Sequence, residues 1–563
     1  MPHRRLPARS LLLCSLVGTA VILPPEMHPI GLALCCFLAL VLGLVLLCRM
    51  RSAAAFGGLE IAAAVWLLTL LRVSTDRHAS GMLLLFILLA ATAFKAGREE
   101  ASSKTGADSL SDTIILLGGV VSLWGLYQVA IGLPGAARSL RAMGQPELDA
   151  MVLRAESGRA FGPFPLPADL GIYLAMALPL AFRKLLAEKG RLSRAAGAAL
   201  AALLLAGIAA SRSYGAVLSL GVAALLLLPI TRFPKKLPAT LLVSGAGAVG
   251  TGAFFLSRGA ERFSPLALRW RNWEAAASLF LDSPALGAGL GGFGDAVTRV
   301  MKTGMNETIF AHNSYLQVAA ETGMVGLGAV LLGVALLLGQ MIRGLKGDRD
   351  SVGRALLCLA PLTFLVHNLF DFSAYLPSLL IPFAAMAGCA ARDALPGVPP
   401  RPAISSRGGW SWQRPAACVL LLALGLGWGL RESLAAALIR SAKEESPLQA
   451  GQAALALGRA ARVSPCHPDP PAMLSEMSLV GTPDDPNRLR VGEAWARRAV
   501  RLRTGRAYGY YILSLYRLAA GDIGEAYVML ERARDRYPER PLYQEQERRL
   551  KEMRGNPAAA GGS

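Results

Sequence analysis

The chain has 563 residues, of which 53% are hydrophobic, and a formal net charge of +20. This composition is too apolar for an ordinary soluble protein. The basic residues punctuate apolar runs and do not form one basic domain with interleaved aromatic residues, so we predict no nucleic-acid partner. They follow the pattern that membrane topology requires.

Long apolar stretches recur over most of the first part of the chain, and a helix needs about 20 such residues to cross a bilayer. We predict about 13 spans, near residues 11–23, 29–48, 54–71, 80–94, 112–133, 167–182, 195–210, 213–230, 238–256, 314–341, 355–370, 374–390 and 416–431. The first span follows a basic N-terminus, as a signal peptide does. No small-x-small cleavage site closes it, so we expect an uncleaved first helix.

The charged loops predict the orientation of the spans. With the N-terminus in the cytoplasm, every inner loop is short and basic, as the positive-inside rule requires. The odd number of spans then places the C-terminal domain outside, which is the periplasm if the membrane is the inner membrane of a two-membrane bacterium. Two outer loops are long, at about 134–167 and 257–313, and both contain Arg. These arginines are either simply solvated or serve a function on the outer face of the membrane.

The chain becomes Arg-rich and helical from about Ser441. Three sets of small and apolar residues share the offsets 0, +4 and +7: Ala453, Leu457 and Ala460; Gly492, Ala496 and Ala499; Ala526, Leu530 and Ala533. The sets are separated by 39 and 34 residues, and a period near 34 resembles tetratricopeptide repeats. A generic pair of helical hairpins is the alternative. Stacked repeats form binding surfaces, so the tail is a candidate docking module for a protein partner.

Few residues of the chain offer acid–base or metal chemistry. The eight Cys form no metal spacing with His, and no disulfide framework can be read. We expect no metal, and we predict no partners for His78 and His467. His312 lies at the outer mouth of the span near 314–341, where an imidazole can accept a proton from a hydroxyl group. A capping or interfacial His is the plainer alternative.

Four arginines lie on the predicted outer side: Arg159, Arg212, Arg269 and Arg271. Guanidinium groups suit pyrophosphate and keep their charge. Arg212 lies in a very short turn between two spans, and an ionisable residue at membrane depth is a functional candidate. Snorkelling of the side chains to the interface is the alternative. His367 and Asp371 lie four residues apart on one helix face, where we favour structural pairing.

The pattern of His312 and Asn313, nine residues, then Gly323-x-x-Gly326 resembles the signature of the O-antigen ligase and polymerase superfamily. Three further segments resemble the same family: Arg159 to Leu174, Ala210 to Ala216, and Arg269-x-x-x-Trp273 followed by Asp282 to Phe293. With the surrounding spans they cover about residues 110–390, and all four lie on the outer side of the predicted topology.

The resemblance implies an all-α, polytopic membrane helix bundle of the GT-C kind and a glycosyltransferase without metal or other cofactor. The implied donor is a glycan on undecaprenyl pyrophosphate, and the implied acceptor is a lipid or glycan hydroxyl. Arg212 and Arg269 would bind the leaving pyrophosphate, and His312 would act on the acceptor hydroxyl as base or orienting group. The substrate-binding residues would be Arg159, Arg271, Asn313 and Tyr315.

The predicted domains are N-terminal transmembrane helices at 1–110, the ligase-like core at 111–392, a basic inner loop with the last span at 393–432, the periplasmic repeat domain at 441–550 and a disordered end at 551–563. The simplest ligases lack such a tail, whereas some polymerase-like and protein-glycosylating relatives have one. Ligase, repeat-unit polymerase and protein O-oligosaccharyltransferase therefore remain open. A polysaccharide transporter or flippase would show pseudo-symmetric halves, and a membrane anchor presenting the tail is a third class.

Overall fold

The computed structural model describes residues 7–49, 74–101, 103–145, 148–228, 264–301, 308–347, 351–391, 413–444, 450–480 and 486–555. These residues form helices and loops with no β-strand among them, so the all-α prediction is confirmed. The chain divides into two compact units. The first unit comprises Met1–Ala55, Phe86–Phe263 and Leu331–Gly427, and the second comprises Phe56–Leu85, Ser264–Val330 and Trp428–Ser563.

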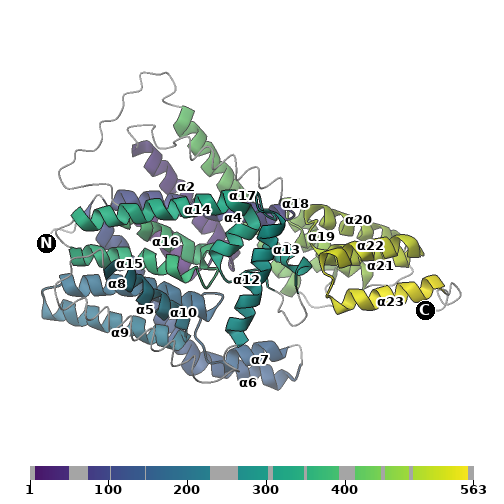
Figure 1. Cartoon of the computed structure of the whole chain (residues 1–563), viewed down its shortest axis with the longest axis horizontal. Helices are drawn as coiled ribbons and strands as arrows, with labels where there is room; N and C mark the ends of the chain where they lie inside the picture. Colours follow the sequence, from purple (N-terminus) through teal and green to yellow (C-terminus); the bar gives the residue numbers. More distant parts are fainter. Residues whose placement is uncertain are drawn as a thin grey trace. The chain divides into compact units, whose positions relative to one another are not determined.

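The first unit is a bundle of apolar helices. Its helices are α1 (Ala8–Ile22), α2 (Pro29–Arg49), most of α4 (Arg77–Glu100), α5 (Lys104–Tyr127), η1 (Gln128–Gly132), α6 (Leu133–Met143), α7 (Asp149–Glu156), α8 (Pro167–Ala187), α9 (Arg191–Ser211), α10 (Tyr214–Leu227), the second half of α14 (Ser314–Gly347), α15 (Ser351–His367), η6 (Ser373–Tyr375), α16 (Pro377–Ala390) and the start of α17 (Gln413–Glu444). Helix α8 is buried from Asp169 to Ala181 and packs against α5, α9, α10 and α15. Figure 1 shows α8 and α9 side by side.

Within the described part of the chain, six helices are long and apolar enough to cross a membrane: Pro29–Leu46, Arg77–Glu100, Thr105–Met143, Pro167–Ala187, Arg191–Ser211 and Ser314–Leu345. Four shorter apolar helices lie at Ala8–Ile22, Tyr214–Leu227, Val352–His367 and Pro377–Ala390. Each predicted span within the described residues coincides with a helix, whereas the spans near 54–71 and 238–256 lie outside those residues.

The segment at 134–167, expected only as an outer loop, contains the short helices α6 and α7. Leu133 and Ala137 of α6 pack against Ala155 of α7, with Phe161 beside them. Helix α6 continues directly from α5 and η1 as far as Met143, whereas α7, with 8 residues, is far shorter than a membrane span. The loop is therefore a helical hairpin.

The second unit contains the start of α4, the helices α12 (Ser264–Asp282), α13 (Phe293–Ala296) and η5 (Val297–Arg299), the start of α14, the end of α17, and the tail. The tail consists of α18 (Ala450–Val463), α19 (Asp469–Leu479), α20 (Pro486–Leu502), α21 (Ala507–Ala519), α22 (Ile523–Arg536) and α23 (Pro541–Gly555). Consecutive tail helices pack against one another (Figure 1).

The small residues that define the predicted repeats lie in the helix contacts of the tail. Ala453, Leu457 and Ala460 are buried in α18, and Ala526, Leu530 and Ala533 are buried in α22. Small side chains at these positions let paired helices approach closely. The helical hairpins are thus observed, while their assignment as tetratricopeptide repeats stays a prediction.

An ion-pair network joins the tail to other segments of the second unit. Arg503 donates two hydrogen bonds of 2.8 Å to the Asp295 carboxylate and lies 3.1 Å from Asp76. The backbone N–H of Thr504 donates to the carbonyl oxygen of Thr75 at 3.0 Å. Asp76 and Asp295 are both buried, and a buried carboxylate needs such a partner. One guanidinium therefore fixes three segments that are far apart in sequence.

Candidate functional site

In the first unit, hydrogen bonds join the Arg159 segment to the Arg212 turn. Arg159 Nε donates to the carbonyl oxygen of Ser211 at 3.2 Å, and Arg212 Nη1 donates to that of Ser157 at 3.1 Å. The N–H of Ala160 adds a bond of 3.0 Å to the carbonyl oxygen of Ala210. The acceptor of Arg212 is a neutral carbonyl, so this bond orients the exposed guanidinium without neutralising its charge.

Gln128 holds the segment that follows Arg159. Its Oε1 accepts from the backbone N–H groups of Phe161 and Gly162 at 3.1 and 2.8 Å, and its Nε2 donates to the Gly162 carbonyl oxygen at 3.0 Å. Three bonds from one amide fix the turn in which Gly162 has a φ of 58°. The sequence carried no signal for this role, because Gln128 lies more than thirty positions from its partners.

In the second unit, His312 directly precedes the N-cap of α14. Asn313 Oδ1 accepts from the N–H groups of Tyr315 and Leu316 at 3.0 Å each, which is the capping geometry that asparagine favours. Trp273 Nε1 donates to the carbonyl oxygen of His312 at 3.1 Å. The indole holds the carbonyl group of His312 and the cap holds the residues that follow it, and His312 as a whole is partly exposed.

Helix α12 presents its two candidate arginines in different directions. Arg269 lies one helical turn before Trp273 and therefore shares its face, whereas Arg271 is two positions away, roughly on the other side of the helix. Arg269 is partly buried and Arg271 is exposed. The face of α12 that contacts His312 through Trp273 is thus the Arg269 face.

The glycines of the His312 signature and of the 282–293 segment meet at a break in α14. Gly323 has a φ of 64° and a ψ of −164°, and a Cβ added there would lie 2.2 Å from the carbonyl oxygen of Ala285. The N–H groups of Ala288 and Gly289 donate to the carbonyl oxygens of Ala320 and Glu321, each at 2.9 Å. The docked loop therefore satisfies carbonyls that the break leaves without helical partners.

Arg212 and His312 share an uncommon backbone conformation. Within the described parts of the chain they are the two non-glycine residues with a left-handed φ, of 48° and 54°. Arg212 caps α9 in this conformation. A non-glycine residue in the left-handed region costs of order 1–3 kcal/mol, and such residues cluster at functional sites.

His367 and Asp371 pair within the first unit, as predicted. His367 Nε2 lies 3.6 Å from Asp371 Oδ2, and His367 Nδ1 lies 3.2 Å from Ser219 Oγ. The Ser219 hydroxyl donates to the Gly215 carbonyl oxygen of its own helix at 2.6 Å. A bond from a helical serine back to its own backbone is common, and the contacts among the three residues accord with the predicted structural pairing.

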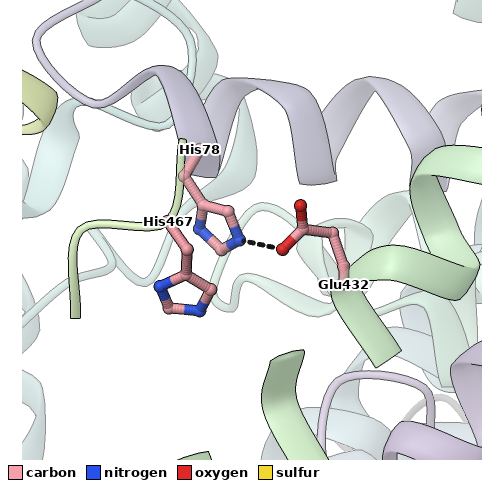
Figure 2. Close-up of side chains that lie close together, drawn as sticks. All are labelled: His78, Glu432 and His467. Carbon is pink, nitrogen blue, oxygen red and sulfur yellow. Dashed lines mark hydrogen bonds and ion pairs between the residues drawn. The ribbon is translucent and has the colours of Figure 1, made fainter. Parts of the chain in front are cut away.

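The expectation that His78 and His467 have no partners is wrong. His78 Nε2 lies 2.9 Å from Glu432 Oε2, and the rings of His78 and His467 have centroids 4.0 Å apart (Figure 2). His78 and Glu432 are 354 positions apart. No local spacing could reveal such a cluster, because folding alone brings its members together.

The tail also contains a cavity of about 330 Å³. Its wall mixes charged and aromatic side chains: Lys443, Asp469, Glu476, Arg503, Arg506 and Tyr508. Partial burial raises the pKa of Glu476, and Arg506 opposes that shift. A wall of both charge signs with an aromatic ring suits a polar ligand or a peptide segment.

Comparison with known proteins finds one matching protein family. Residues 199–331, about a quarter of the chain, match the family model described as O-antigen ligase. This range includes Arg212, Arg269, Arg271, His312 and the glycine break at Gly323, while Arg159 lies before it. No curated protein matches the chain. Residues 199–331 therefore form an O-antigen ligase-related region, which together with the apolar helices supports a multi-pass membrane protein and a glycosyl-transferring enzyme.

Proposed function

We propose that the protein transfers a glycan from an undecaprenyl pyrophosphate carrier to an acceptor hydroxyl at the periplasmic face of the bacterial inner membrane. The proposal rests chiefly on Arg212 and His312. Both lie in the range that matches the O-antigen ligase family, both flank an apolar helix, and both have a left-handed backbone. A cation and a base are the two groups that transfer from a pyrophosphate donor needs.

The chemistry assigns a different task to each group. The acceptor oxygen attacks the anomeric carbon of the donor sugar, and the bond from that carbon to the pyrophosphate oxygen breaks. His312 takes the proton of the attacking hydroxyl. Arg212 and Arg269 stabilise the negative charge on the departing lipid pyrophosphate, as permanently charged guanidinium groups can.

The remaining candidates would hold the substrates. Arg159, which is hydrogen-bonded to the Arg212 turn, would bind the pyrophosphate from the same side. Asn313 positions the start of α14, and Tyr315 follows it on the first helical turn. Arg271 would contact a substrate from the exposed side of α12.

The glycan profile of the native host distinguishes ligase from polymerase. A gene-deletion strain is complemented with the wild-type chain or with His312→Ala. A ligase loses the glycan-capped lipid while long lipid-linked polymer accumulates, and a polymerase loses polymer length and leaves single repeat units. A protein O-oligosaccharyltransferase loses only glycosylated protein. A His312→Ala strain with the wild-type profile would overturn the proposal.

We also infer that the tail binds a protein partner that helps to present the acceptor. The cavity bounded by Asp469, Arg506 and Tyr508 supports this, because its two charge signs can pair with a peptide of mixed charge. Tyr508→Ala should lower acceptor modification in cells while donor turnover in isolated membranes is unchanged. Equal modification by Tyr508→Ala and wild type would contradict the docking role.

A further inference from the structure

Two imidazoles and a carboxylate converge in the second unit, and none of the three is among the residues proposed for transfer. His78 lies at the start of α4, Glu432 lies in α17, and His467 lies in the turn between α18 and α19 (Figure 2). One potential ligand atom from each residue can be chosen so that all three lie within 4.8 Å of one another. Three segments of distant sequence thus bring nitrogen and oxygen donors to one point.

Glu432 and His78 are largely shielded from solvent, unlike the partners of an ordinary surface ion pair. Glu432 is 3% exposed, and the His78 side chain is 17% exposed. A carboxylate buried to this degree needs a positive partner. The rings of His467 and His78 have centroids 4.0 Å apart, so a second imidazole lies beside the carboxylate and its nitrogen can serve as a further ligand.

Neighbouring groups hold the carboxylate in place. Ser464 Oγ donates to Glu432 Oε1 at 2.7 Å, which leaves Oε2 facing His78. Support of this kind orients metal ligands in proteins. The helices also approach closely beside the cluster, because a Cβ on Gly81 of α4 would lie 2.7 Å from the indole of Trp428 in α17.

We propose that His78, Glu432 and His467 form a binding site for a divalent transition metal, with zinc as the best fit. Two imidazoles and one carboxylate are a known zinc ligand set, and they leave a fourth position for water or another ligand. Calcium and magnesium prefer ligand sets made of oxygen. The metal would fasten the start of α4, the end of α17 and the α18–α19 turn to one another.

Metal binding would change the distances and hydrogen bonds within the cluster. Tetrahedral zinc with bonds of about 2.0–2.1 Å needs ligand atoms roughly 3.4 Å apart. His78 Nε2 and Glu432 Oε2, which lie 2.9 Å apart, would therefore separate slightly, and any pair of ligand atoms wider than this, within the limit of 4.8 Å, would close in. The metal would replace the His78–Glu432 hydrogen bond of 2.9 Å. It would also replace the bond of 3.2 Å in which His467 Nδ1 accepts from the Asp469 N–H, because a neutral imidazole has one lone pair.

The test uses the full-length chain in detergent, stripped with a chelator and dialysed against zinc. We expect one equivalent of bound zinc by elemental analysis and a thermal midpoint several degrees above that of the stripped protein. His467→Gln and Glu432→Gln should lose both effects. The matched controls, His28→Gln and Cys466→Ser, should keep them, since His28 lies outside the cluster and Cys466 is the thiol next to it.

Cobalt substitution keeps the test decisive if a variant misfolds. Wild-type protein loaded with cobalt should show the visible absorption of a tetrahedral site without a sulfur-to-metal band. Less than about a tenth of an equivalent of zinc in the wild type, or equal binding in His467→Gln, would show that the cluster is an ion pair only. A sulfur-to-cobalt band that Cys466→Ser abolishes would also overturn the proposed ligand set.

Discussion

The indole Nε1 of Trp273 donates a hydrogen bond of 3.1 Å to the carbonyl oxygen of His312. This bond joins two motifs that lie 39 positions apart, the tryptophan segment of α12 and the histidine before α14. It holds the backbone of His312 in the left-handed conformation, whose φ is 54°. On the proposed mechanism, Trp273 is a positioning residue, and the His312 imidazole is the group that would act on substrate.

Trp273→Phe should lower glycan transfer roughly 2- to 10-fold, because a typical hydrogen bond contributes about 0.5–1.5 kcal/mol. The ring remains, so the protein should stay folded. Transfer is measured as glycan-capped product formed by membranes from the complemented strain. Trp270→Phe is the matched control: Trp270 is 59% exposed and donates to Glu274 of its own helix, so it should retain wild-type activity. Equal activity of the two variants would remove Trp273 from the positioning role.

Arg212→Lys should lower transfer about tenfold or more, and Arg212→Ala should lower it further. A lysine keeps the charge but cannot bond the Ser157 carbonyl oxygen and a pyrophosphate with a planar fork. The assay is turnover of lipid-linked donor in membranes, with protein amount checked by immunoblot. Arg138→Lys, an exposed position on α6, should behave as wild type. Full activity in Arg212→Lys would mean that only charge matters there.

Gly323→Ala should destabilise the protein by at least about 2 kcal/mol. The added Cβ would lie 2.2 Å from the Ala285 carbonyl oxygen, in a backbone conformation with a φ of 64° that alanine adopts poorly. Thermal unfolding of the purified protein in detergent measures the effect. Gly328→Ala is the control on the same helix, since a Cβ there meets nothing within 4 Å. Matching unfolding curves for both variants would argue against the break in α14.

Arg503→Met should destabilise the second unit by about 3–5 kcal/mol, because it leaves two buried carboxylates, Asp76 and Asp295, without their cation. We expect earlier proteolysis of the tail and a lower thermal midpoint. Arg501→Met, at an exposed position two residues away, should change neither. A tail equally resistant in both variants would show that the network contributes little.

Much of the helix bundle could be predicted because span length follows directly from bilayer thickness. The predicted spans near 29–48 and 195–210 correspond closely to α2 and α9. Arg212 stood out because so short a turn leaves a charged side chain few places to go. His312 stood out because it lies at the outer mouth of a predicted span and opens the pattern of His-Asn, nine residues, then Gly-x-x-Gly.

The parts that could not be predicted depend on contacts between distant segments. The break at Gly323 exists because the loop around Ala285 docks there, and a regular apolar pattern continues through it. Gln128 looks like an ordinary polar residue at the end of a span until the turn after Arg159 folds onto it. The His78–Glu432–His467 cluster likewise has no local spacing.

The most direct test of the central claim is release of undecaprenyl pyrophosphate from glycan-loaded donor in membranes that contain the wild-type chain, His312→Ala or Arg212→Ala. Ligase and polymerase reactions both release this product, so the measurement does not depend on the acceptor. The account predicts release by the wild type and loss of at least about 100-fold in each variant, with normal amounts of protein in the membrane. Release at the wild-type rate by His312→Ala would contradict the assignment of His312 to the transfer reaction.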